Sequence, residues 1–234
     1  MTITTRAGKG SALTHNEMDT NFTDLRDGVG GRIWQKTQNA GDLIDPSSPD
    51  FGWIDIHAPL YFNSSGTPAV FSSYRGGISQ WQFTETTADE AFCEFHIPHD
   101  YAMGTDIFFH VHWSHASTTV TGGSVTWAFE MSYSKGHDQA IFAAPKTVTI
   151  QQNASTTQYQ HMIAEAAGTV SGGSGTQFDS AIMEPDGVFI CRFYLDSNDI
   201  TDSVTQPNPF VHFVDLHMQS TGIATKNKSP DFWT

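Results

Sequence analysis

Hydrophobic and polar residues alternate with a period of two over several stretches of the chain. The clearest stretch is 124–133, with Val125, Trp127, Phe129, Met131 and Tyr133 at alternate positions. Successive side chains of a β-strand point to opposite faces, so this pattern predicts a strand with one buried face. We therefore assign Trp127, Phe129 and Tyr133 to the hydrophobic core.

Other segments show the same pattern at similar spacing. Strands are predicted at 91–97, 106–115, 187–195 and 210–218, with weaker candidates at 53–57, 80–84, 146–150 and 158–163. Segment 187–195 is almost continuously apolar, which is typical of a central strand. Glycine-containing turns and loops fall at 121–123, 135–138 and 170–175. No helical pattern intervenes, so we predict an antiparallel, jelly-roll-like β-sandwich over residues 32–234.

The pattern near the N-terminus is helical. Thr14 is a suitable N-cap residue, and Glu17 three positions later completes a capping box. Leu13, before the cap, is placed to contact Met18 as a hydrophobic staple. A helix is therefore predicted to begin after Thr14.

A narrow apolar stripe follows along this helix. Met18, Phe22 and Leu25 recur at helical spacing, and the glycines at 28, 30 and 31 end the pattern. A helix of about a dozen residues is marginal alone in water. It must dock on its own domain or on a partner, and the sequence leaves both open. Residues 1–31 are predicted to form an anchor helix with a glycine hinge.

The net charge of the chain limits the partners that it is expected to bind. The chain has 25 acidic and 11 basic residues and a net charge of −14. Binding to nucleic acid or to an anionic membrane needs clustered Lys and Arg, so we expect neither. We find no apolar run long enough to cross a bilayer and no signal-peptide pattern, so synthesis in a cytoplasm is expected. Cys93 and Cys191 lie among apolar residues and are predicted to be buried free thiols.

Candidate metal chemistry lies at residues 106–115. His110 and His112 share one strand face, and Trp113 belongs to the opposite face and to the core. Two imidazoles at this spacing can reach one metal ion. The segment resembles the paired-histidine strand of α-type carbonic anhydrases, a family that needs a third histidine on a neighbouring strand. The next predicted strand has Glu130 but no histidine, so His110 and His112 are either weak metal candidates or hydrogen-bonded polar residues.

The other histidines do not decide whether His110 and His112 bind a metal ion or are hydrogen-bonded polar residues. His96, His99, His212 and His217 are further imidazoles, but no spacing selects any of them as a ligand.

Three segments together resemble tailed-bacteriophage virion proteins. Residues 9–22 closely resemble the GSxLTHxExDxNF segment at the start of many tail-fibre and appendage proteins, and residues 219–233 resemble their closing segment. The central match is a HxHW strand followed by a WxxExxY strand, carried by His110, His112, Trp113, Trp127, Glu130 and Tyr133.

The resemblance implies a non-enzymatic virion structural subunit without a cofactor. It implies a homo-oligomer, with a trimer favoured, anchored to tail, portal-adaptor or capsid proteins and possessing a surface for a host glycan or receptor. The expected anchoring residues are Leu13, Thr14, Glu17, Met18, Phe22 and Leu25. Two alternatives stay open: a capsid decoration or head-fibre protein, and a zinc-dependent hydratase or hydrolase that uses the paired-histidine strand.

Overall fold

The computed structural model describes residues 10–19, 21, 33–34, 43–44, 51–62, 69–84 and 89–232. The chain divides into two compact units, Met1–Phe51 and Gly52–Thr234. We expected the boundary after residue 31. The first unit extends further and includes a short antiparallel sheet in which β1 (Ile33–Trp34) pairs with β2 (Leu43–Ile44).

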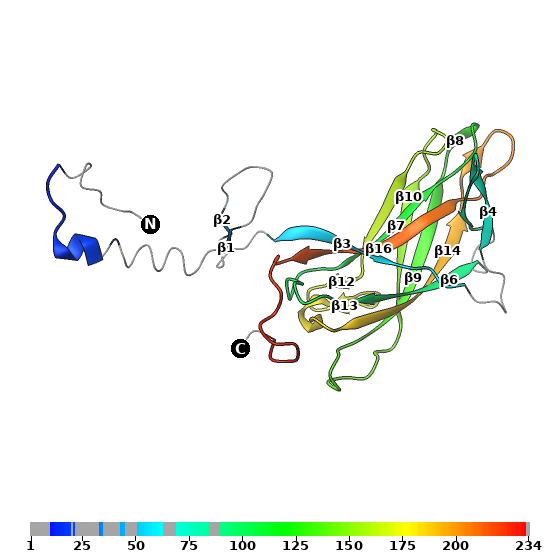
Figure 1. The fold of residues 1–234 in the computed structure, drawn as a ribbon. Coiled ribbons are helices and arrows are strands. Elements are labelled where there is room, and N and C mark those ends of the chain that lie inside the picture. The colour runs from blue at the N-terminus through cyan, green and yellow to red at the C-terminus, as the bar shows by residue number, and fades with distance from the viewer. Residues whose placement is uncertain are drawn as a thin grey trace. The chain divides into compact units, whose positions relative to one another are not determined.

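The N-terminal helix begins where the capping box predicts, and residues 15–19 are helical (Figure 1). The backbone N–H of Thr14 donates to Oε2 of Glu17 at 2.7 Å, and the N–H of Glu17 donates to Oγ1 of Thr14 at 3.3 Å. The capping box is therefore confirmed. Met18 is 36% exposed. Phe22, Leu25 and the predicted glycine hinge lie outside the described residues, and the staple between Leu13 and Met18 stays a prediction.

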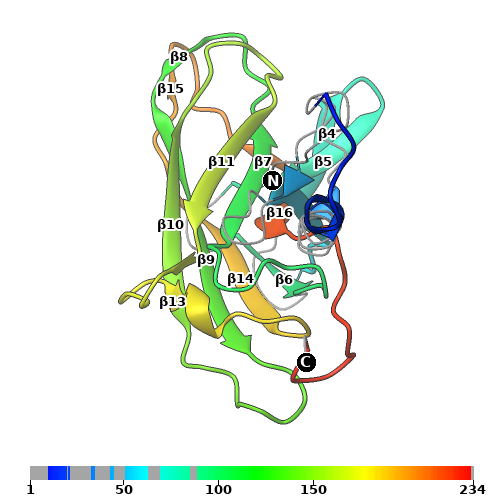
Figure 2. The same cartoon turned by 90° about the vertical axis from the view of Figure 1, so that its left-hand side faces the viewer.

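The second unit consists mainly of two antiparallel sheets, as predicted for a β-sandwich (Figures 1 and 2). The first sheet has the order β10 (Lys146–Asn153), β9 (Ser124–Ser134), β14 (Val188–Asn198) and β6 (Glu90–His96). The second has the order β11 (Met162–Ala167), β7 (Phe108–Ser114), β16 (Phe210–Ser220), β5 (Ile78–Gln82) and β4 (Val70–Arg75). β3 (Gly52–Ala58) also pairs with β16, along its C-terminal half.

Short elements lie at opposite ends of these sheets. β8 (Val120–Gly122) pairs with β15 (Thr201–Asp202) at one end. β12 (Thr169–Val170) pairs in parallel with β13 (Phe178–Asp179) towards the other end (Figures 1 and 2). A 3₁₀ helix at Ser180–Ile182 follows β13.

Aromatic rings from both sheets fill the core. The ring of Phe109 on β7 lies 4.8 Å from that of Phe129 on β9, and the ring of Trp113 lies 6.2 Å from that of Trp127. Trp113, Trp127 and Phe129 are fully buried, and Tyr133 is 2% exposed. All four side chains that we assigned to the core lie there.

Two predicted strands are shifted along the chain. The strand expected at 158–163 begins at Met162, because Tyr159 adopts a φ of 59° and its N–H donates to the carbonyl of His115 at 2.9 Å. The strand expected at 80–84 spans Ile78–Gln82, and its partner β4 was not predicted.

Two further expectations concern the cysteines and the membrane. Cys93 and Cys191 are free and buried, as predicted, and they face each other across β6 and β14. Among the described residues, no helix has the length and apolar character needed to span a membrane.

Candidate functional site

The paired histidines lie on the outer face of the second sheet. β7 turns Phe109, Val111 and Trp113 towards the core, which leaves His110 and His112 on the opposite side. Pairing with the neighbouring strands brings acidic residues to this face. Asp215 on β16 and Glu165 on β11 both stand opposite His110.

Asp215 lies between the two imidazoles. Its Oδ1 is 3.1 Å from Nδ1 of His110, and its Oδ2 is 3.1 Å from Nε2 of His112. The side chain is almost completely buried, at 2% exposure. Burial alone would raise the pKa of Asp215, but its contacts with His110 and His112 outweigh burial and hold the pKa far below its ordinary value. Asp215 is therefore a buried, ionised carboxylate.

His110 also contacts a second carboxylate through its other ring nitrogen. Its Nε2 lies 2.5 Å from Oε2 of Glu165 and 3.1 Å from Nδ1 of His217. Burial lowers the pKa of His110, but hydrogen bonds to Asp215 and Glu165 outweigh it, so that the pKa is raised. His110 therefore lies between two acidic groups, one at each ring nitrogen.

His112 is held in a different environment. Its Nδ1 lies 2.8 Å from Nε2 of His161, and its ring stacks on Phe213 at 3.9 Å. Burial lowers the pKa of His161 and of His212, which falls to about 4, and neighbouring imidazoles lower both further. Because Nε2 of His112 faces Asp215, the tautomer with its proton on Nε2 is favoured, and Nδ1 then accepts a hydrogen bond from Nε2–H of His161.

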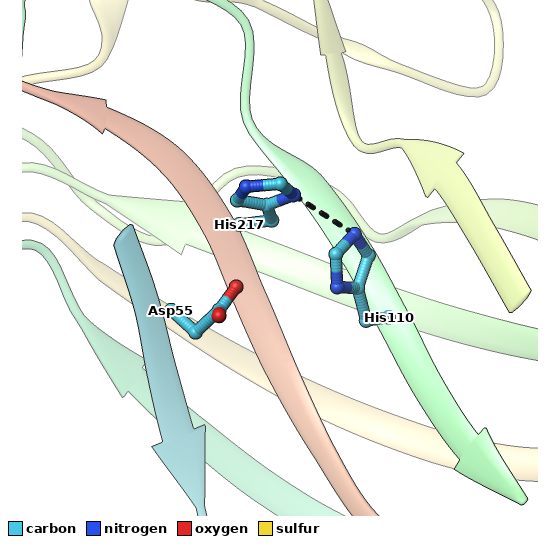
Figure 3. A group of neighbouring side chains, drawn as sticks. All are labelled: Asp55, His110 and His217. Atoms are coloured by element: carbon cyan, nitrogen blue, oxygen red, sulfur yellow. Dashed lines mark hydrogen bonds between the residues drawn. The ribbon is translucent and has the colours of Figure 1, made fainter. Parts of the chain in front are cut away.

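Two overlapping groups have the donor atoms for a metal ion. Donor atoms of His110, His112 and Asp215 all lie within 4.8 Å of one another, as do those of Asp55, His110 and His217. Figure 3 shows the second group, in which β3, β7 and β16 each contribute one residue. Asp55 is exposed and His217 is half-buried, so this group is accessible from solvent.

The sequence identified these residues only in part. It singled out the pair His110 and His112, and it named His217 without a reason to choose it. It missed Asp55, Glu165 and Asp215. Asp55 and Asp215 fall at alternating polar positions of predicted strands, but nothing local indicates that β3, β7 and β16 lie together.

The carbonic-anhydrase-like arrangement is not reproduced around Glu130. This residue lies on β9, in the other sheet, and pairs with Arg192 at 3.4 Å. The neighbours of β7 are β11 and β16, and the described side chains nearest to His110 are carboxylates and His217.

A second histidine cluster lies at the end of the first sheet. Nε2 atoms of His96, His99 and His137 lie 3.2, 3.0 and 2.6 Å from the carboxylate oxygens of Asp186. Burial raises the pKa of Asp186, but the hydrogen bond from His137 and the nearby charges of all three imidazoles outweigh this effect and lower it. The end of β6, which carries His96, and the turns that carry His99 and His137 meet at this one carboxylate.

No protein-family model matches the sequence, and no curated protein matches it. Solved structures that match the chain in part include the CBM22-1–GH10 modules of a Clostridium thermocellum xylanase complexed with xylohexaose (12% identity, 75% of this chain, TM-score 0.34). Others are the xylan-binding module CBM15 (8% identity, 72% of this chain and 97% of that one, TM-score 0.33) and CBM35 from Cellvibrio japonicus Abf62 (9% identity, 72% and 98%, TM-score 0.28). The chain spans 28% of the length of the xylanase. Similarity at these TM-scores does not indicate a function for this chain.

Proposed function

We propose that the chain is a non-enzymatic structural subunit of a tailed-bacteriophage virion, an appendage of tail-fibre type attached through its N-terminal segment. The supporting observation is the helix that begins after Thr14, within the segment resembling phage appendage proteins. Its capping box is formed, yet Met18 on its apolar stripe is 36% exposed. A short helix gains stability mainly by burying such a stripe, so a docking partner that covers the stripe accounts for this helix.

Self-association is the second part of the proposal. The β4–β5 hairpin exposes three large apolar side chains: Val70 is 52% exposed, Phe71 59% and Ile78 60%. Among the strands that the structure describes, β4 is also an edge strand of the second sheet. Exposed apolar residues on an edge strand favour association between chains. A cyclic homo-oligomer buries them, and the resemblance favours a trimer.

A host-surface glycan is the proposed external partner. Trp53 on β3 is 48% exposed and lies on the outer face of the second sheet, 4.6 Å from the ring of His217. An exposed indole offers an apolar face and a polar edge, which suits contact with a sugar ring.

The attachment proposal is tested by following incorporation of the full chain into particles of the phage that encodes it. We expect Met18→Asp to reduce incorporation at least tenfold, because a charge on the stripe opposes docking. Asn16→Asp is the matched control, since it adds the same charge at an exposed polar position of the same helix. Absence of the wild-type chain from purified particles would refute the virion role.

Two alternatives are separated by further measurements. A capsid decoration or head-fibre protein belongs to the same class, and labelling the chain in particle images distinguishes capsid from tail. A zinc-dependent hydratase or hydrolase predicts carbonic-acid or ester turnover that depends on added zinc and is lost in His112→Ala. Zinc-dependent turnover in the wild-type chain would favour the enzyme over the non-enzymatic subunit.

A further inference from the structure

We propose that Asp55, His110, Glu165 and His217 bind one divalent transition-metal ion on the outer face of the second sheet. Zinc is the best chemical match, because two imidazoles and two carboxylates form a ligand set that it accepts. The four residues come from β3, β7, β11 and β16, and Figure 3 shows three of them. These strands are hydrogen-bonded in the order β3–β16–β7–β11, so the ion ties together four neighbouring strands.

The distances among the donor atoms suit a tetrahedral site. Nδ1 of His217 lies 3.1 Å from Nε2 of His110, and Oε2 of Glu165 lies 2.5 Å from that Nε2 and 3.4 Å from Nδ1 of His217. Zinc bonds of about 2.0–2.1 Å place tetrahedral ligand atoms about 3.3 Å apart. Of these three distances, the one between His110 and Glu165 must lengthen, and the Glu165 side chain is 48% exposed and free to adjust.

The fourth ligand approaches the same two histidines. A carboxylate oxygen of Asp55 lies within 4.8 Å of donor atoms of His110 and His217. Asp55 stands opposite His217 in the pairing of β3 with β16, so both side chains lie on one face of the sheet.

Charge at this position favours a cation. Nε2 of His110, Nδ1 of His217 and Oε2 of Glu165 converge on one point. A single proton placed between them cannot form hydrogen bonds with all three atoms. Within the part of the chain that the structure describes, the ion pairs of Glu165 and Asp215 are made with histidines and not with Lys or Arg. A divalent ion supplies the charge that these carboxylates lack and accepts both nitrogen lone pairs.

Asp215 acts as a positioning residue behind the site. Its Oδ1 lies 3.1 Å from Nδ1 of His110, on the far side of the ring from Glu165 and His217. A carboxylate that binds one ring nitrogen fixes the tautomer and aims the other nitrogen at the metal, as in many zinc proteins. The buried Asp215 therefore presents the Nε2 lone pair of His110 to the ion.

Four protein ligands define a closed, structural site. Catalytic zinc keeps one position open for water or substrate, whereas structural zinc takes all four ligands from the protein. The metal that we propose therefore stabilises the sheet and does not depend on the virion role.

The test uses the full-length chain, stripped of metal with a chelator and titrated with zinc chloride in a calorimeter. We expect one zinc ion per chain and an increase in thermal midpoint on binding. His217→Ala and Asp55→Asn should each weaken zinc binding at least about tenfold. Asp55 is exposed, so Asp55→Asn preserves folding even if the histidine variant does not.

His57→Ala is the matched control. His57 is an exposed histidine on β3 at an alternate position to Asp55, and it lies against Phe213, outside the ligand set. This variant should bind zinc as the wild-type chain does. The proposal is overturned if the wild-type chain binds no stoichiometric zinc, if Asp55→Asn binds as tightly as the wild type, or if His57→Ala weakens binding equally.

Discussion

Two buried tryptophans differ in one hydrogen bond. Trp113 and Trp127 are both fully buried, but Nε1 of Trp113 donates to Oε1 of Gln152 at 2.6 Å, whereas Nε1 of Trp127 has no partner among the described residues. Replacement by Phe removes similar apolar area at both sites. We expect Trp113→Phe to lower the free energy of unfolding by about 1–2 kcal/mol more than Trp127→Phe, because only the former breaks a hydrogen bond.

Urea unfolding of both variants measures this difference. Circular dichroism is the probe, because each variant removes a tryptophan and so changes the fluorescence. Gln152→Leu provides the control, since it removes the acceptor and should bring the two Phe variants to nearly equal stability. Equal destabilisation in the unaltered background would mean that the Trp113–Gln152 bond contributes nothing.

Asp186 carries a pH-dependent part of the stability. Its pKa in the folded state is lowered from the ordinary value of 3.8, because the imidazole contacts outweigh the effect of burial. A depressed carboxyl pKa contributes stability that is present above the unfolded pKa and is lost as pH falls through the folded pKa. Asp186→Asn should therefore be destabilised by about 1–2 kcal/mol near pH 6, and its deficit should shrink as pH falls below 3.8.

Chemical unfolding at several pH values measures this deficit. Asn is a suitable replacement because Asp186 has a φ of 62°, a left-handed conformation that Asn tolerates. Asp138→Asn is the control, since Asp138 has a φ of 58° and is exposed. A deficit for Asp186→Asn that does not change with pH would exclude an ionic origin.

At the scale of elements, local patterns predicted strands well and their partners poorly. The alternation of 124–133 and the apolar run of 187–195 correspond to β9 and β14, because burial of one or both faces is recorded in neighbouring residues. β4 was missed because its residues alternate weakly and its apolar side chains are exposed. The capping box was predictable because both of its bonds join residues three apart.

The exposed β4–β5 hairpin provides a test at this scale. Phe71→Glu places a charge on the face of the hairpin that the exposed Phe71 shares with Trp81, whose rings lie 4.9 Å apart. If this surface joins subunits, the variant should shift the oligomer to monomer at micromolar concentration, because burying an unpaired charge is costly. Light scattering coupled to size-exclusion chromatography measures the mass of the particle.

Val204→Glu is the control for that variant. Val204 is 77% exposed but lies after β15, away from the hairpin in the chain. It should leave the mass unchanged. A wild-type chain that is already monomeric would rule out the hairpin interface and weaken the appendage proposal.

At the scale of the whole molecule, the candidate site depends on contacts between distant parts of the chain. Asp55 and His217 meet because β3 pairs with β16, and Glu165 reaches His110 because β11 pairs with β7. Such pairings join residues far apart in sequence, so periodicity reports which face a residue occupies and not which strand lies beside it. The sequence therefore indicated the histidine pair and left the acidic ligands unidentified.

The two compact units predict separable properties. Gly52–Thr234 contains the two main sheets, the β4–β5 hairpin and all four proposed metal ligands, whereas the capped helix belongs to Met1–Phe51. A chain lacking residues 1–51 should therefore unfold cooperatively, keep the oligomeric state of the full chain and bind zinc with unchanged affinity, yet fail to join particles. Calorimetry, light scattering and particle incorporation measure these properties separately. If the shortened chain neither folds nor joins particles, the first unit is needed for the stability of the sandwich. If the shortened chain joins particles fully, the helix is not the anchor.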